Sequence, residues 1–191
     1  MVHEAHAHDD KNNSIFKIAM NLGITCFISG VIIAGTFAVT EPSAQQQRIK
    51  AKNDAMQELV KDAQTFKAVE GKTDWYAALK DGKVIAYVVP ANGKGYGGNI
   101  EMLAAVTPDG KAMDFKVLKH SETPGLGDKM VESKFRKQFA GKTPNDLEVV
   151  KVPTDKNIQA LTGATITSRA VTKGIREAAE MVAEYSASQK K

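Results

Sequence analysis

The sequence predicts an α+β protein in which a single N-terminal transmembrane helix precedes one domain, built from a mostly antiparallel sheet with flanking helices. Three observations support this fold class. An apolar run of 22 residues, 18–39, contains no ionised side chain. Short runs of strand-forming residues are joined by Asp-Gly turns, which are typical of antiparallel hairpins. The last part of the chain carries apolar residues at spacings of three and four, the period of an amphipathic helix.

The composition limits the classes of function. With 191 residues, of which 42% are hydrophobic, the chain has room for one core-forming domain plus an anchor. The formal net charge of +4 comes from lysines spread along the sequence, so we expect no nucleic-acid partner. Cys26 is the single cysteine, which excludes a disulfide framework or a cysteine-based metal site within one chain. His3, His6 and His8 lie in a polar tail that we expect to be disordered, and we predict neither a metal site nor a catalytic residue.

The apolar run predicts a membrane anchor at residues 15–40, after a polar tail at 1–14. As a helix rising about 1.5 Å per residue, the run would extend about 33 Å, enough to cross a hydrocarbon core of about 30 Å. A cleaved signal peptide is the alternative, because Lys11 and Lys17 precede the run and small residues follow it. The apolar core of a signal peptide spans only about 7–15 residues, so we favour a retained anchor.

The charges that flank the anchor give a weak signal of orientation. Lys11 and Lys17 precede the span, whereas Arg48, Lys50 and Lys52 follow it. The positive-inside rule therefore leans by one charge toward a cytoplasmic C-terminal domain. This margin is too small to outweigh stronger arguments.

After the anchor, the spacing of apolar residues predicts a helix over residues 44–69, within a connecting segment at 41–70. Two strands are expected at 75–79 and 84–89, joined by an Asp-Gly turn, with Pro90 closing the second. These strands begin the main domain, which we place at residues 71–191.

A second hairpin is expected from strands at 100–106 and 112–117, turned by a Pro-Asp-Gly sequence. Apolar and polar residues alternate in its second strand, which favours a sheet with one covered face and one wet face. Between the two hairpins, residues 92–99 include four glycines. Taken alone, this segment indicates a sharp turn or a close backbone approach, and it lacks the strand and helix that flank a dinucleotide-binding motif.

The next loop, at 120–128, is shaped by one proline and two glycines. We expect Asp128 to cap a helix that presents Val131, Phe135 and Phe139 on one face. A further strand is predicted at 147–152.

The segment LTGATITSR at 161–169 precedes the most clearly amphipathic helix of the chain. Two interpretations remain open from the residues themselves. The segment can be a capped helix start, with Thr167 or Ser168 as the cap. It can also be an anion site, because backbone N–H groups and the positive end of the helix dipole favour a phosphate at such a junction.

Three loops, GYGG at 95–98, ETPGLG at 122–127 and TGATIT at 162–167, follow a single N-terminal span in this order. The arrangement resembles the FMN-binding G subunit of the Rnf ion-translocating electron-transport complex over essentially the whole chain. It is nearly as similar to the related C subunit of the sodium-translocating NADH:quinone reductase, which is usually longer. The third loop matches the flavinylation signature of this family, in which the phosphate of FMN is joined to a threonine hydroxyl. That threonine is Thr165 here.

The resemblance implies one FMN-binding domain with covalently held FMN as its cofactor. The residues it implies as cofactor contacts come from the three loops. They are Tyr96, Gly97, Gly98, Glu122, Thr123, Leu126, Gly127, Thr162, Gly163, Ala164, Thr165, Ile166 and Thr167.

A threonine hydroxyl is a poor nucleophile without a base or a metal to activate it. The resemblance accordingly implies that a separate, magnesium-dependent flavin transferase attaches the cofactor, with FAD as donor. One position departs from the family pattern: many such motifs carry Asp six residues before the threonine, where this chain has Gln159, with Asp155 further upstream.

By resemblance, the chain is an electron carrier that relays electrons between neighbouring flavin and iron–sulfur subunits of a membrane complex, and it is not an enzyme on its own. The resemblance also implies a single-pass protein of the inner (plasma) membrane with its C-terminal domain on the extracytoplasmic, periplasmic side. Three alternatives stay open: the C subunit of a sodium-translocating NADH:quinone reductase, a free-standing membrane-anchored flavin reductase, and an assembly factor that has lost the cofactor.

Overall fold

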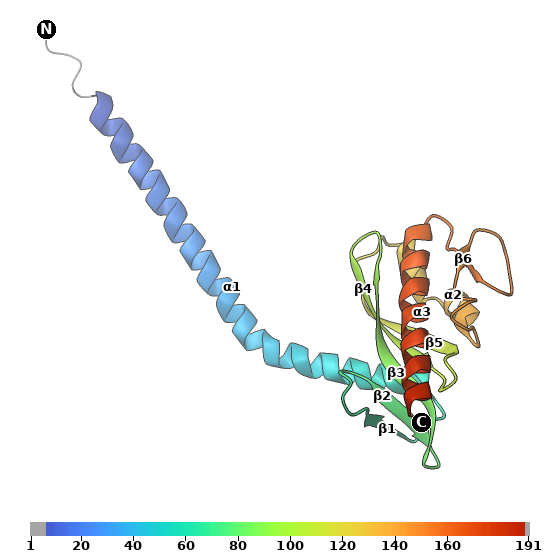
Figure 1. Ribbon diagram of the computed structural model, residues 1–191. Helices are drawn as coiled ribbons and strands as arrows, with labels where there is room; N and C mark the ends of the chain where they lie inside the picture. Colours follow the sequence, from blue (N-terminus) through green and yellow to red (C-terminus); the bar gives the residue numbers. More distant parts are fainter. Residues whose placement is uncertain (1–6, 190–191) are drawn as a thin grey trace, which may run out of the picture. The chain divides into compact units, whose positions relative to one another are not determined.

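The computed structural model describes the backbone of residues 7–189 and the side chains of residues 15–41 and 43–189. The chain divides into two compact units, Met1–Lys50 and Ala51–Lys191. Figure 1 shows the order of the elements along the chain. His3 and His6 lie outside the described residues.

The described part of the first unit, residues 7–50, belongs to one helix, α1 (Ala7–Leu59), whose C-terminal end continues into the second unit. Its segment Ile15–Glu41 is long and apolar enough to cross a membrane. The Thr25 and Thr36 hydroxyls each donate to the carbonyl four residues earlier, so these polar groups are satisfied inside the helix. The expected disorder of the tail is wrong for residues 7–14, because no glycine or proline separates them from the apolar run and the helix extends into them.

The helix expected over 44–69 ends earlier, at Leu59. Residues 65–68, the end of the predicted helix, instead form strand β1 (Thr65–Ala68), which pairs antiparallel with β2 (Tyr76–Lys80). Phe66 lies opposite Ala78 in this pair. The helical spacing of the apolar residues is therefore overridden by pairing with a strand whose residues lie 8 to 14 positions further along the chain, which the local pattern does not report.

The second unit is organised around a five-stranded antiparallel sheet with the strand order β1-β2-β3-β4-β5. The remaining strands are β3 (Lys83–Lys94), β4 (Asn99–Val106) and β5 (Ala112–Lys119). Asp81 and Gly82 both have positive φ, 50° and 75°, as a two-residue hairpin turn requires. The predicted α+β class and its antiparallel hairpins are confirmed.

Strand β3 does not end at Pro90, contrary to the sequence prediction. It continues to Lys94, and Pro90 pairs with Leu103 of β4. The pairing of β2 with β3 reaches only as far as Val88. Beyond that point β3 has β4 as its paired neighbour and an open edge on the other side, where proline is tolerated.

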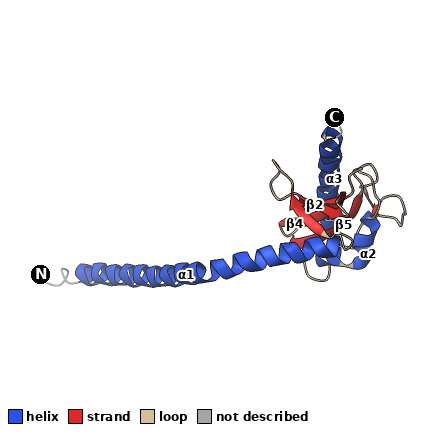
Figure 2. Ribbon diagram, turned by 90° about the horizontal axis from the view of Figure 1, so that it is seen from below, coloured by secondary structure: helices blue, strands red, loops and turns tan. Residues whose placement is uncertain are grey.

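Helices cover both faces of the sheet. The expected wet face is therefore wrong for β3, the central strand, whose side chains are buried on both faces. Helix α3 (Thr165–Ser188) packs its buried Val171, Ile175 and Val182 with Met102 and other residues on one face. On the opposite face, Met56 and Leu59 of α1 pack with Leu103 and other neighbours. Figure 2 shows the strands between these helices.

The single helix expected after residue 128 is replaced by three short turns: η1 (Gly127–Val131), α2 (Ser133–Arg136) and η2 (Lys137–Phe139). Asp128 makes no capping hydrogen bond and Val131 is exposed, so both expectations are wrong. Phe135 and Phe139, predicted to share one helix face, are both buried, and each packs edge-to-face on Phe115. These aromatic contacts hold the segment against the sheet without a continuous helix.

The strand expected at 147–152 is reduced to β6 (Val149–Val150), which pairs parallel with β7 (Ile158–Gln159). This short pair leads directly into the loop before α3.

Candidate functional site

The three loops singled out in the sequence meet at the N-terminal end of α3. The first forms the tight turn between β3 and β4, where the Gly95 N–H donates to the Gly98 carbonyl at 2.8 Å. Gly98 has a φ of 139°, a backbone conformation that other residues rarely adopt. The turn carries Tyr96, which is 75% exposed.

Glu122 joins the other two loops to this turn. Its side chain is 5% exposed, and its carboxylate accepts hydrogen bonds from the N–H groups of Gly97 (2.8 Å) and Tyr96 (3.3 Å). The Thr167 hydroxyl, on the first turn of α3, donates to the same carboxylate. A buried carboxylate with several donors is the arrangement that makes burial of its charge tolerable.

The glycines around Glu122 are required by close packing. A Cβ at Gly95 would lie 2.3 Å from Glu122 Oε1, and one at Gly127 would lie 2.9 Å from Glu122 Cβ. His120 Nδ1 accepts the Glu122 N–H at 3.2 Å, which gives this histidine a structural contact. The sequence marked Glu122 as a cofactor contact but gave no sign that it is the hub of the loops, because its partners lie 25 to 45 residues away.

The second loop closes on itself. The N–H groups of Leu126 and Gly127 both donate to the Thr123 carbonyl, at 3.2 and 3.1 Å. This turn sets Leu126 against Gly163, where an added Cβ would lie 3.0 Å from Leu126 Cδ2. Gly163 also has a φ of 78°, so the start of the third loop needs glycine for its conformation as well as for space.

Helix α3 begins at Thr165, with Ala164 in the N-cap position and no side-chain cap. The predicted caps are wrong because both hydroxyls are used elsewhere: Thr167 bonds Glu122, and Ser168 Oγ accepts the Leu161 N–H while donating to the Ala164 carbonyl, both at 2.9 Å. Within the described part of the chain, the half-buried Thr165 forms no side-chain hydrogen bond. The N–H groups of the first turn have no intrahelical partners, and that turn contains no acidic residue.

A cavity of about 550 Å³ opens at this junction. It brings together ten of the thirteen residues that the sequence implied as contacts: Tyr96, Glu122, Thr123, Leu126, Gly127, Gly163, Ala164, Thr165, Ile166 and Thr167. Gly97, Gly98 and Thr162 do not line it; the first two shape the turn that carries Tyr96, and Thr162 precedes the cavity wall.

The cavity has the size and the chemistry to hold a flavin mononucleotide. Its volume lies in the usual range of ligand pockets, about 300–1,000 Å³. Tyr96, Leu126 and Ile166 are large, exposed apolar side chains that can flank a flat ring. Thr165 and the free N–H groups of the first turn of α3, in the same cavity, suit a phosphate.

Gln159, six residues before Thr165, is held in place by hydrogen bonds of its backbone to the Gln138 side chain. In β7, the Gln159 N–H donates to Gln138 Oε1 at 2.7 Å, and Gln138 Nε2 donates to the Gln159 carbonyl at 3.5 Å. This pair fixes β7, and with it the start of the third loop.

Comparison with known proteins gives a consistent assignment. The domain family described as an FMN-binding domain matches residues 95–180, a span that contains all three loops. The G subunit of the proton-translocating ferredoxin:NAD(+) oxidoreductase complex of Clostridium ljungdahlii is 57% identical over 180 residues, covering 94% of this chain and 97% of the relative. The G subunit of the Na(+)-translocating ferredoxin:NAD(+) oxidoreductase complex of Acetobacterium woodii is 31% identical, covering 84% and 88%.

The fold also matches a solved structure, that of the C subunit of the Na(+)-translocating NADH-quinone reductase from Parabacteroides distasonis. The TM-score is 0.54 at 20% identity, covering 71% of this chain and 92% of the other. This likeness shows the fold alone.

Proposed function

This chain belongs to the G-subunit family of ion-translocating ferredoxin:NAD(+) oxidoreductase complexes, and we infer that it serves such a membrane complex as an electron-transport subunit with an FMN-binding domain. We propose further that FMN is held covalently, through a phosphoester to Thr165, and that the chain relays electrons between neighbouring flavin and iron–sulfur subunits. The runner-up, the C subunit of a NADH:quinone reductase, rests on a likeness of fold, whereas the likeness to the G subunits extends over almost the whole chain.

The proposed covalent link is supported by the position of the Thr165 hydroxyl and by its lack of a hydrogen-bond partner in the described part of the chain. Its hydroxyl is the one in the TGATIT loop that lines the cavity and lacks a hydrogen-bond partner among the described residues, whereas Thr167 is bound to Glu122. A phosphoester at Thr165 would place its negative charge at the positive end of the α3 dipole, beside the N–H groups of the first turn. No carboxylate of that turn opposes it.

The remaining lining residues would bind and orient the cofactor. Bound FMN supplies the ability to accept and release electrons. Tyr96, Leu126 and Ile166 provide apolar contacts for the ring while leaving one side of the cavity open, which suits electron exchange with a partner. Glu122 keeps the loops in register without needing to touch the ring.

The site supports attachment by a separate enzyme. Activation of a threonine hydroxyl requires a base or a metal, and the one carboxylate that lines the cavity, Glu122, is already occupied by three donors. We therefore propose that a flavin transferase with FAD as donor modifies Thr165 and reads the exposed loop around it. Gln159 positions the strand before this loop through its backbone hydrogen bonds and not through its side chain. The missing aspartate would therefore affect the efficiency of the transferase more than the geometry of the site.

We propose that Ile15–Glu41 is a retained single membrane span and that the domain, placed at 71–191 by the sequence, lies on the extracytoplasmic side. A covalent tether would keep the cofactor in a compartment that has no flavin pool. Protease added to sealed spheroplasts should digest the domain; full protection would contradict this orientation.

The attachment is tested on the full chain purified from its own membranes. Mass spectrometry should find FMN less one water on the peptide that contains Thr165, and Thr165→Ala should give a folded, membrane-inserted chain without flavin fluorescence on a denaturing gel. Exposed Thr73→Ala is the matched control, since Thr73 lies outside the three loops, and it should keep the fluorescence. Covalent fluorescence in Thr165→Ala would refute the assignment. Steady turnover of a soluble acceptor by the isolated chain would instead favour the free-standing reductase.

A further inference from the structure

A ridge of cations runs along α3 from the flavin end of the domain, and the function proposed above does not use it. The ridge consists of Arg169, Lys173 and Arg176, which recur at spacings of four and three and so share one face of the helix with Thr165. Arg169 follows Thr165 by one turn. From Arg169 to Arg176 the ridge extends about 10 Å along the helix axis.

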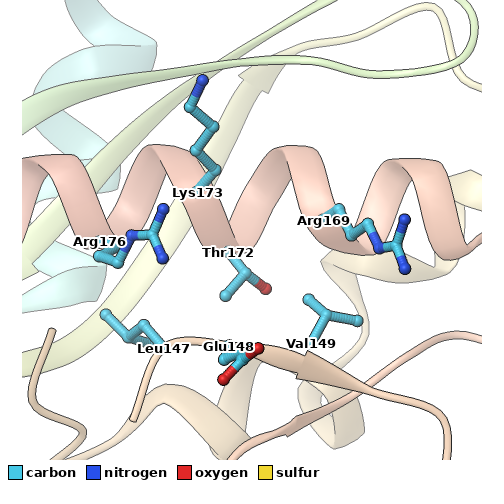
Figure 3. A pocket seen from close by; sticks show the side chains of 7 residues that line it. All are labelled: Leu147, Glu148, Val149, Arg169, Thr172, Lys173 and Arg176. Carbon is cyan, nitrogen blue, oxygen red and sulfur yellow. The ribbon is translucent and has the colours of Figure 1, made fainter. Parts of the chain in front are cut away.

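Two shallow grooves border this ridge. One, of about 320 Å³, lies between α3 and the β6 segment; Figure 3 shows Arg169 and Arg176 on either side of Thr172, across from Glu148. The other, of about 380 Å³, lies beside the end of β3 and includes Lys94 and Ile166. Lys173 borders both grooves, and Ile166 is shared with the flavin cavity.

The charges of the ridge are not explained by the stability of the helix. Lys173 pairs with Glu177 at 3.7 Å and Arg176 with Glu180 at 4.0 Å, in both cases with the cation nearer the N-terminus, which is the less favourable order. These side chains are 42 to 68% exposed, so the pairs contribute little. Arg169 forms no ion pair among the described residues, so it adds no such pair to the stability of α3.

From these observations we propose that the ridge of Arg169, Lys173 and Arg176 is the docking surface for a protein partner with an acidic face, which it holds beside the open side of the flavin cavity. The proposal rests on the proposed function, because it assumes an electron partner that must approach the flavin.

The layout favours a protein over a small anion. A single phosphate cannot span a ridge of about 10 Å, and Glu148 and Glu177 in the grooves would repel a compact polyanion. A protein face can place its carboxylates opposite the cations and its own cations opposite these two glutamates. Exposed Ile166, 53% accessible, and Tyr96 supply an apolar centre next to the charged rim, as protein interfaces require.

The test uses the complete membrane complex. The triple variant Arg169→Gln, Lys173→Gln, Arg176→Gln is compared with Lys67→Gln, Lys80→Gln, Lys83→Gln, which removes the same charge from exposed positions on the first three strands. We expect reduction of the covalent flavin in the ridge variant to be slower by about tenfold or more at low salt, which is the size of effect that electrostatic steering has on association. The reduction rate should also lose most of its dependence on salt. The control variant should behave as the native complex.

A second measurement identifies the partner. A photo-crosslinking residue replaces exposed Glu177, which leaves all three cations in place. The proposal requires a crosslink to an acidic segment of another subunit, and a Lys173→Glu variant that is rescued by reversing a carboxylate in that segment. A crosslink to lipid, or a native reduction rate in a ridge variant that retains its flavin, would overturn the docking surface and leave the proposed function intact. Loss of flavin from the ridge variant would also overturn the docking surface, because it would show that the cations serve the attachment of FMN. Absence of covalent flavin from the native chain would instead refute the proposed function.

Discussion

At the scale of single residues, Glu122 decides the geometry of the site. Its carboxylate accepts bonds from the turn that carries Tyr96 and from the first turn of α3. The sequence could predict the positions of the three loops, because glycine, proline and threonine leave local signals. It could not predict which side chain joins them, since burial of Glu122 arises only after β3 to β5 have paired and α3 has packed.

Replacement of Glu122 by glutamine tests this role. The amide keeps one acceptor for the Gly97 N–H, but its NH2 group faces the Tyr96 N–H, which loses its partner. Because this hydrogen bond is only partly buried, water can replace part of it, so the free energy of unfolding should fall by about 0.5–1.5 kcal/mol, the net contribution of a typical hydrogen bond. Denaturant titration measures the change, and hydrogen exchange should show faster exchange of the Tyr96 and Gly97 amides.

Exposed Glu101 on β4 provides the matched control, because Glu101→Gln changes the same group without a buried partner. Equal stability of Glu122→Gln and the native chain, with unchanged amide exchange, would show that Glu122 does not position the loops.

At the scale of elements, close backbone contacts lock α3 onto β3. A Cβ at Gly174 would lie 2.6 Å from the Asn92 carbonyl oxygen, and one at Gly93 would lie 2.3 Å from the Ala170 carbonyl oxygen. This approach fixes where the N-terminus of α3 points, and hence the position of Thr165. The hairpins were predictable because Asp-Gly turns are local signals. The end of α1 and the broken helix at 127–139 were not, because a strand partner and an aromatic cluster, both distant in sequence, determine them.

An ionic network ties the end of α1 to the sheet and to α2. Lys116 donates to Glu58 at 2.6 Å, and Arg136 contacts both Glu58 (3.1 Å) and Asp114 (2.7 Å). Hydrogen bonds from Lys116 and then Arg136 lower the pKa of the Glu58 carboxyl below its usual 4.5. A lowered folded pKa means that this stabilisation is complete above pH 4.5 and is lost as the pH falls through the folded value.

We therefore expect Glu58→Gln to be less stable than the native chain at pH 7, and the difference to disappear as the pH falls through the lowered folded pKa of Glu58 and its carboxyl becomes protonated. Because the pair is partly exposed, the difference at pH 7 should be about 0.2–1 kcal/mol. Thermal unfolding of the full chain in detergent across this pH range measures it. Exposed Glu132→Gln is the control, and a constant difference between Glu58→Gln and the native chain at every pH would contradict the network.

At the scale of the whole molecule, the compact unit begins at Ala51, twenty residues before the boundary that the sequence predicted for the domain. The difference has a physical cause. The last turns of α1 cover the sheet face opposite α3, burying Ala55, Met56 and Leu59. Periodicity alone could predict that this helix has an apolar face, but not that the face belongs to the core of the flavin domain.

Two fragments distinguish these boundaries. A fragment of residues 51–191 keeps both hydrophobic clusters and should fold as a soluble domain with a cooperative thermal transition. A fragment of residues 71–191 loses Met56, Leu59 and Val60 together with β1, and it exposes Val88 and Leu103 on the sheet. Each large apolar side chain contributes about 1.5–3 kcal/mol when buried, and a domain is stable by only about 5–15 kcal/mol. The shorter fragment should therefore aggregate or unfold without a cooperative transition, as circular dichroism and size-exclusion chromatography would show. Equal stability of the two fragments would support the boundary at residue 71.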